Sequence, residues 1–146
     1  MPPAHSPRLP TRAFRWLQPR ADRSYLITGG LGAIGLHTAS YLAQLGAGDI
    51  VLTSRRTPDA EAQRAIADIT KRYRCRIHTF PADVGDEAQA TELLERIRAE
   101  LPPLAGVAHL AGVLDDALLP QQSLEHFRAT LAPKALGGRY LDRLTK

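Results

Sequence analysis

Strand-like and helix-like segments alternate along residues 25–146, and this alternation limits the possible folds more than any other feature of the sequence. Short apolar or β-branched runs lie at residues 25–28, 50–53, 76–80 and 107–111. Between these runs, apolar residues recur at spacings of three and four, as in amphipathic helices. The predicted helices span residues 36–45, 59–73, 86–101 and a last stretch from Ser123, interrupted at Pro133. Repeated strand–helix–strand units predict an α/β doubly wound parallel sheet with helices on both faces.

Local signals refine three of these elements. Gly46 is expected to end the first helix. Residues 76–80 alternate polar and apolar and end at Pro81, which favours an edge strand. Asp86, followed three residues later by Gln89, resembles a capping box at the start of the third helix.

The motif Gly30-x-Gly32-x-x-Gly35 follows the first strand and opens the first helix. In this context the first glycine permits a tight turn, the second lets the backbone approach a pyrophosphate, and the third lets helix and strand pack closely. Free amides and the helix dipole then favour a bound phosphate. A glycine-rich turn without ligand is the alternative, and the strand–turn–helix context disfavours it.

The second predicted strand ends at Ser54-Arg55-Arg56, where an NAD-binding chain usually carries an acidic residue. A guanidinium suits the 2′-phosphate of NADP(H), whereas a carboxylate repels it. The sequence therefore favours NADP(H) over NAD(H). A surface turn facing water is the alternative for this arginine pair.

Two further pairs lie where the carboxyl ends of parallel strands bind ligands. Asp83-Val84 follows the third strand, and Ala111-Gly112 is expected to end the fourth. The Asp83 carboxylate is suited either to the adenine amino group or to capping the following turn. A small side chain at residues 111 and 112 leaves room for a cofactor.

Charge and composition exclude several classes of protein. The net charge of +4 arises in residues 1–24, an arm with five arginines and five prolines, and the remainder is balanced. A nucleic-acid-binding protein instead concentrates positive charge on a folded face. This chain is therefore not expected to bind nucleic acid. No apolar run suits a membrane span or a signal peptide, and Cys75 is the single cysteine. These features predict a soluble, cytoplasmic protein. The spacing of the histidines predicts no metal site; those considered are His37, His78, His109 and His126.

Five segments resemble, in order and spacing, the ketoreductase domains of type I polyketide synthases and multifunctional fatty acid synthases, within the short-chain dehydrogenase/reductase superfamily. They are residues 25–35, 54–56, 83–84, 109–113 and 132–135. The resemblance covers residues 24–146. It implies a Rossmann-like sheet and NADPH-dependent reduction of a β-ketoacyl thioester carried on an acyl carrier protein. Residues 1–24 are then expected to be a linker or a remnant of a preceding structural subdomain, and residues 25–146 the NADP-binding portion.

The resemblance also implies roles for individual residues. It implies that the three motif glycines bind the pyrophosphate and that Arg55 binds the 2′-phosphate. It also implies that Asp83-Val84 contacts the adenine and that Ala111-Gly112 contacts the nicotinamide-side ribose. Lys134 matches the lysine of the family's catalytic tetrad. Leu114-Asp115-Asp116 matches a motif associated with the 3R hydroxyl. The complete expected cofactor site is Thr28, Gly29, Gly30, Gly32, Ala33, Ile34, Gly35, Ser54, Arg55, Asp83, Val84, Ala111 and Gly112.

The family's catalytic serine and tyrosine lie beyond the lysine-bearing helix, and the printed sequence ends at Lys146. Tyr140 is no substitute, because six residues after Lys134 it points to another helix face. The expected sheet is therefore incomplete, with about four strands, and the chain is expected to supply the cofactor-binding half without activity of its own. An NADP-binding module without catalysis and a truncated, non-functional fragment are the alternatives. The expected partners are the carrier-bound substrate and neighbouring synthase domains, with no nucleic acid and no membrane.

Overall fold

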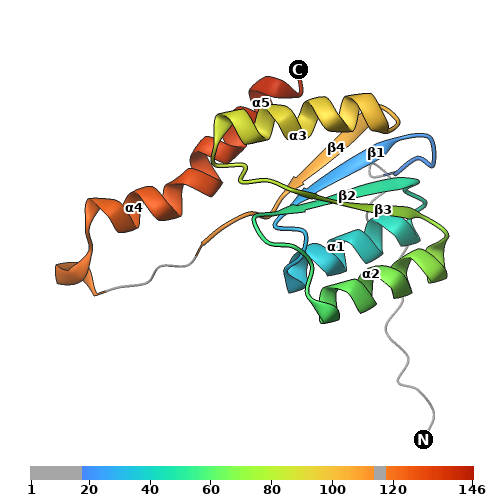
Figure 1. The fold of residues 1–146 in the computed structure, drawn as a ribbon, viewed down its shortest axis with the longest axis horizontal. Helices are drawn as coiled ribbons and strands as arrows, with labels where there is room; N and C mark the ends of the chain where they lie inside the picture. The colour runs from blue at the N-terminus through green and yellow to red at the C-terminus, as the bar shows by residue number, and fades with distance from the viewer. Residues whose placement is uncertain (1–17, 114–117) are drawn as a thin grey trace, which may run out of the picture.

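The computed structural model describes residues 18–113 and 118–146. Four parallel strands form one sheet in the order β3-β2-β1-β4 (Figure 1). The strands are β1 (Ser24–Thr28), β2 (Asp49–Ser54), β3 (Arg76–Pro81) and β4 (Leu104–His109). The edge position of β3 is as predicted. Most of the predicted 1–24 arm and the motif at residues 114–116 lie outside the described residues.

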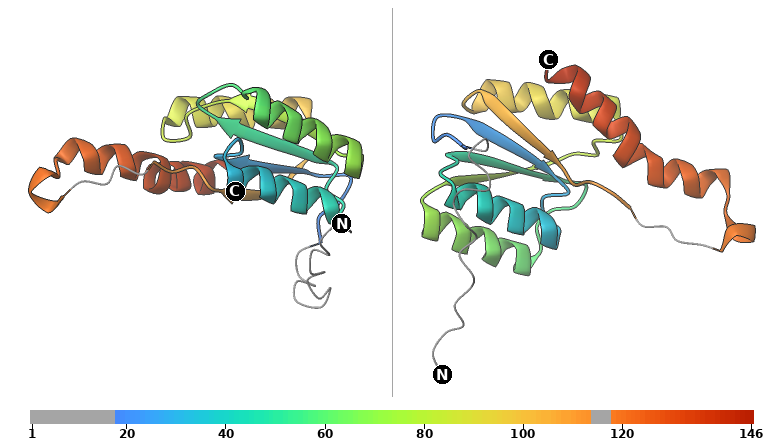
Figure 2. Two further views of the ribbon diagram at one scale, coloured as in Figure 1. Left: turned by 90° about the horizontal axis from the view of Figure 1, so that it is seen from below. Right: turned by 180° about the vertical axis from the view of Figure 1, so that it is seen from behind.

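Helices cover both faces of the sheet (Figures 1 and 2). One face carries α1 (Ala33–Gln44) and α2 (Ala60–Tyr73). The other carries α3 (Glu87–Glu100) and α5 (Gly137–Leu144). Between β4 and α5 the chain forms a 3₁₀ turn (Leu119–Gln121), helix α4 (Leu124–Leu131), which projects away from the sheet, and a π turn (Ala132–Leu136).

Alternating side chains of the strands divide the core into two layers. Tyr25 and Ile27 face α1 and α2, whereas Leu26, between them, faces α3 and α5. Leu26 and Ile27 are both completely buried. This alternation is the period-two pattern of a strand with both faces covered.

The crossovers bring all four carboxyl strand ends to one edge of the sheet. The chain leaves β1 toward β2 on one side and returns through α3 to β4 on the other. Strand order therefore reverses beside β1, which is where open α/β sheets bind their ligands.

Side-chain caps fix the starts of α2 and α3. Asp59 accepts a hydrogen bond from the amide of Ala62 at 2.8 Å, and Asp86 accepts one from the amide of Gln89 at 3.0 Å. The predicted capping box at Asp86 is only half formed. The Gln89 side chain does not return to the Asp86 amide but accepts from the amide of Asp83 at 2.9 Å.

Some predicted element bounds were wrong. The fourth strand, predicted at residues 107–111, spans Leu104–His109. It begins early because Leu104 pairs with Ser24, whose hydroxyl donates to the Pro102 carbonyl at 2.7 Å. It ends early because the chain then turns toward the end of β1, so residues 111 and 112 follow the strand. Helix α1 begins at Ala33, inside the glycine motif, and not at residue 36.

An ionic cluster around one buried carboxylate lies at the opposite, amino-terminal edge of the sheet. Asp49, 1% exposed, accepts two hydrogen bonds from the Arg76 guanidinium, at 2.8 and 2.6 Å, and lies 2.9 Å from Nε2 of His78. The bonds from Arg76, followed by that with His78, lower the pKa of Asp49, although burial opposes this shift. Burial also raises the pKa of the neighbouring Cys75.

Within the described residues, no helix is long and apolar enough to cross a membrane. The same residues contain no group of three His, Cys, Asp or Glu side chains placed to hold a metal ion.

Candidate cofactor site

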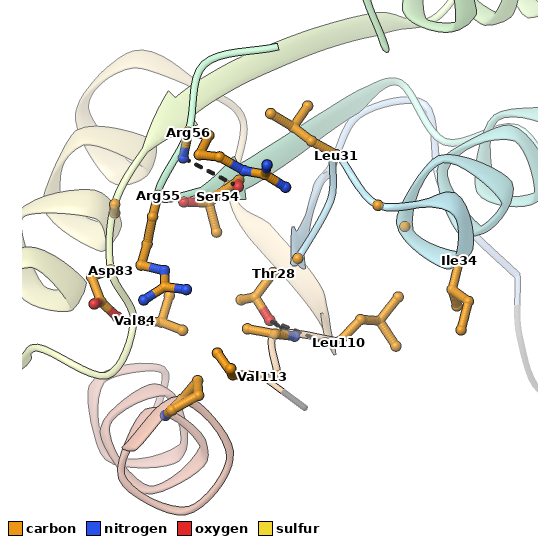
Figure 3. A pocket seen from close by; sticks show the side chains of 18 of the residues that line it. Thr28, Leu31, Ile34, Ser54, Arg55, Arg56, Asp83, Val84, Leu110 and Val113 are labelled. Atoms are coloured by element: carbon orange, nitrogen blue, oxygen red, sulfur yellow. Dashed lines mark hydrogen bonds between the residues drawn. The ribbon is translucent and has the colours of Figure 1, made fainter. Parts of the chain in front are cut away.

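A cavity of about 820 Å³ opens at the carboxyl edge of the sheet (Figure 3). Its size is in the range of sites that hold small molecules and cofactors. All four strand ends and the start of α1 contribute to its wall. The lining includes every residue expected in the cofactor site except Gly30. Lining residues that were not predicted as site residues are Leu31, Thr53, Arg56, Ala82, Leu110, Val113 and Pro133.

The glycine motif brings backbone close to backbone. A Cβ on Gly35 would lie 2.4 Å from the carbonyl oxygen of Gly29, and one on Gly29 would lie 2.8 Å from that of Leu110. Gly29 also has a φ of +65°, in the left-handed region that glycine adopts readily. Gly30 packs against Leu52 of the sheet, which explains why it does not line the cavity. Gly32 is exposed, with only the Gly29 carbonyl near its missing side chain, at 3.4 Å.

The start of α1 lines this space and has no side-chain cap. Gly32 is the N-cap residue, so it offers no side-chain acceptor, and the first turn of α1 has no acidic residue. Unpaired amides and the positive end of the helix dipole make such a terminus favourable for an anion.

Two arginines line the cavity at the end of β2. In Figure 3, the Arg55 side chain extends toward Asp83 and Val84, whereas that of Arg56 extends toward Leu31. The Arg56 amide donates to the Ser54 hydroxyl at 3.3 Å, which shapes the turn. No carboxylate of the described residues forms an ion pair with either guanidinium. This wall of the cavity is therefore positively charged.

The loop after β3 is fixed from two sides. One carboxylate oxygen of Asp83 accepts from the Gly85 amide at 2.9 Å, and the Asp83 amide donates to Gln89 of α3. Val84 is 3% exposed and packs in the core beneath α3 and α5. Asp83 thus caps its own turn, and its second carboxylate oxygen still has no hydrogen-bond partner among the described residues. The two alternatives for Asp83 are compatible.

Thr28 ties the end of β1 to the end of β4. Its hydroxyl oxygen accepts from the amides of Leu110 and Ala111, at 3.0 and 3.1 Å, and lies 2.7 Å from Nδ1 of His109. Because both acceptor positions of the Thr28 oxygen are filled, we assign its hydroxyl as the donor and Nδ1 of His109 as the acceptor. The ring proton of His109 is then on Nε2. Sequence reasoning did not identify this role of His109; its position at the end of a strand was the only signal.

Lys134 lies beside the cavity, within the π turn. A Cβ on Gly112 would be only 2.9 Å from Cε of Lys134, so the lysine stem crosses Gly112. Pro133, which precedes the lysine, lines the cavity. Tyr140 lies on α5, where the Arg143 guanidinium is 5.8 Å from the centre of its ring.

The family model described as KR domain matches residues 23–146. This chain belongs to the KR domain family. The ketoreductase resemblance, which began at residue 24, is thereby confirmed.

The relatives of this KR chain are large synthases, and the chain matches a short segment of each. A 6-methylsalicylic acid synthase of Arthrobotrys oligospora is 36% identical over 152 residues, covering 97% of this chain and 9% of that protein. The highly reducing polyketide synthase milA of Cordyceps militaris is 38% identical over 121 residues, covering 83% and 5%. The chain therefore spans less than a tenth of either synthase.

Solved ketoreductases have the same fold. A ketoreductase domain of the bacillaene assembly line superposes with a TM-score of 0.83 at 30% identity, covering 89% of this chain and 31% of the other. For the first ketoreductase of the tylosin polyketide synthase the TM-score is 0.74 at 38% identity, covering 88% and 27%. The predicted Rossmann-like α/β fold is confirmed.

Proposed function

We propose that this KR chain binds NADP(H) and supplies the cofactor-binding half of a ketoreductase. The complete domain reduces a β-ketoacyl thioester on an acyl carrier protein to the β-hydroxyacyl thioester, within a cytoplasmic polyketide synthase. One observation carries the proposal: the start of α1, which has no side-chain cap, and an arginine pair without an ion-pair partner among the carboxylates of the described residues line the same cavity.

Each end of the cofactor has a matching part of the cavity wall. We place the pyrophosphate at the start of α1, against Gly32 and Gly35, and the 2′-phosphate at Arg55 with Ser54. The free oxygen of Asp83 suits the adenine amino group. The small residues Ala111 and Gly112 leave space for the nicotinamide-side ribose.

When bound, NADPH supplies the hydride for the ketone carbon. Lys134, whose stem crosses Gly112, is suited to donate hydrogen bonds to the adjacent ribose. Reduction also needs a positioned proton donor, and Tyr-x-x-x-Lys does not occur in the printed sequence. We therefore propose that these 146 residues bind the cofactor without turnover. The reaction then requires the family's serine and tyrosine in addition, and Leu114-Asp115-Asp116 directs it to the 3R hydroxyl.

The proposal is tested by measuring NADPH and NADH affinities for the wild-type chain and for Arg55→Asp. A charge-assisted hydrogen bond contributes about 1.5–3 kcal/mol, so the preference for NADPH is expected to fall by about tenfold to 100-fold. Arg64→Asp, on the exposed side of α2, is the charge-matched control and should keep the preference.

An unchanged preference in Arg55→Asp would refute the assignment of the 2′-phosphate. Absence of NADPH binding to the wild-type chain would refute the proposed function. Reduction of a β-ketoacyl thioester analogue by the wild-type chain alone would contradict the need for the family's serine and tyrosine.

A further inference from the structure

Gly137, the first residue of α5, is in contact with Val84, which lines the cavity, and with His109, the last residue of β4. A Cβ at this position would lie 3.1 Å from the carbonyl oxygen of Val84, and 3.3 Å from both Cγ2 of Val84 and Cε1 of His109. Gly137 is buried. The start of α5 therefore rests with its bare backbone on the loop after β3 and on the end of β4.

Neither support is free to move. Val84 is buried between Asp83 and Gly85, which are joined by the Asp83 carboxylate, and the Asp83 amide is bonded to α3. The His109 ring is held by the hydroxyl of Thr28. A side chain at residue 137 would therefore displace α5 and not Val84 or His109. The Val84 carbonyl and the hydrogen-bonded His109 ring cannot rotate away from it.

Gly137 is also connected to Lys134 through the backbone. Its amide donates to the carbonyl of Ala132 and so closes the π turn that contains the lysine. Ala132 makes a second contact of the same kind, because a Cβ on Gly85 would lie 3.1 Å from its carbonyl carbon. Single π turns in α-helices occur frequently at functional sites.

We propose that Gly137 is a positioning residue for Lys134. Its missing side chain lets the π turn lie against Val84 and His109, and this placement holds the lysine stem across Gly112. The role in ketone reduction rests on the proposed function, but the placement of the lysine does not.

The same contact couples the two ends of the cavity. Val84 touches the proposed adenine position on one side and Gly137 on the other. Because the loop after β3 is already fixed, the proposed adenine position and Lys134 are held by the same rigid contact.

The test uses the three lysines of the chain, Lys71, Lys134 and Lys146. Reductive methylation with ¹³C-formaldehyde keeps their charge and gives each dimethylamine a resonance, which Lys134→Arg assigns. Gly137→Ala is expected to change the chemical shift of the Lys134 resonance, because the lysine stem no longer lies across Gly112, and to leave that of Lys71 unchanged. Gly138→Ala is the matched control, because its Cβ would meet Cδ2 and Nε2 of His109 at the ordinary contact distances of 3.7 and 3.9 Å, and should leave the resonance in place.

An unchanged Lys134 resonance in folded Gly137→Ala, or an equal change in Gly138→Ala, would overturn the inference. If circular dichroism shows that Gly137→Ala does not fold, Gly85→Ala decides, since it presses on Ala132 from the loop and should also move the resonance. Titration with NADP⁺ separates the two proposals. If the wild-type chain does not bind NADP⁺, only the proposed function is contradicted. The lysine resonances recorded without nucleotide test only whether Gly137 positions Lys134.

Discussion

Asp49 is the side chain on which the amino-terminal edge of the sheet depends. We expect Asp49→Asn to lower the free energy of unfolding at neutral pH by about 2–3 kcal/mol, because it replaces the carboxylate shared by Arg76 and His78 with a neutral amide that has a single acceptor oxygen. Asp142→Asn is the control, since Asp142 forms an exposed pair with Lys146. Urea denaturation measures both.

The same residue predicts a pH dependence. The folded-state pKa of Asp49 is lowered from its ordinary value of 3.8, so its contribution is fully present at higher pH and is lost as the pH falls below that value. The difference in stability between wild type and Asp49→Asn should therefore shrink in acid. A difference that stays constant from pH 7 to pH 3 would contradict this origin.

Two glycines of the motif separate stability from binding. Gly35→Ala places a methyl group 2.4 Å from a backbone oxygen and should lower the free energy of unfolding by about 3 kcal/mol. Gly32→Ala meets nothing closer than 3.4 Å and should keep its stability within about 0.5 kcal/mol. Its methyl group enters the proposed pyrophosphate position, so NADPH affinity should fall by about tenfold or more. Equal losses of stability in the two variants would refute this division.

At the level of single elements, α2 depends on its cap. Asp59→Ala removes the acceptor for the Ala62 amide and should cost about 1 kcal/mol, or about 3 °C in Tm. Asp59→Ser should restore most of the loss, and Asp68→Ala, in the exposed middle of α2, should cause none. Calorimetry of the three variants checks the expectation, which fails if Asp59→Ala and Asp68→Ala melt alike.

The sequence predicted those elements best whose local signals agree with the fold. Residues 25–28 and 50–53 are β-branched and apolar because both sheet faces are covered, and their bounds were right to within a residue. The predicted start of β4 was wrong because Ala105 and Gly106 do not have the β-branched or large apolar side chains typical of a strand. The start is set by pairing with Ser24, which is distant in the sequence. The interruption at Pro133 was expected from the missing amide, but its form as a π turn depends on contacts with Gly85 and Val84, which no local pattern contains.

Across the whole molecule, one sheet supports two cores. Leu26→Ala and Ile27→Ala remove completely buried side chains from opposite faces, and each should cost about 2–5 kcal/mol. Because both faces share the same strands, each variant should still unfold in a single transition. Ile34→Ala, at a side chain 71% exposed, is the control. Hydrogen exchange in Leu26→Ala that frees α3 while leaving α1 protected would contradict a single cooperative unit.

The part of the candidate site that could be predicted is the part that follows from parallel strands, whose carboxyl ends meet at one edge of the sheet. Knowing that four strands are parallel is enough to bring Thr28, Ser54, Asp83 and Ala111 to one edge. The supports of that edge were not predictable, since the partners of Thr28 and Asp83 depend on side-chain orientations. Gln89 and His109 were therefore assigned other roles or none.

The ionic cluster at Asp49 and the arginines after Ser54 lie at opposite ends of β2, whose terminal residues Asp49 and Ser54 are ~17 Å apart at about 3.3 Å per residue. Substitutions at such separations usually have additive effects. We therefore expect substitutions at the two ends of β2 to act independently: those at Asp49 should change the free energy of unfolding, and those at Arg55 should change the proposed coenzyme preference.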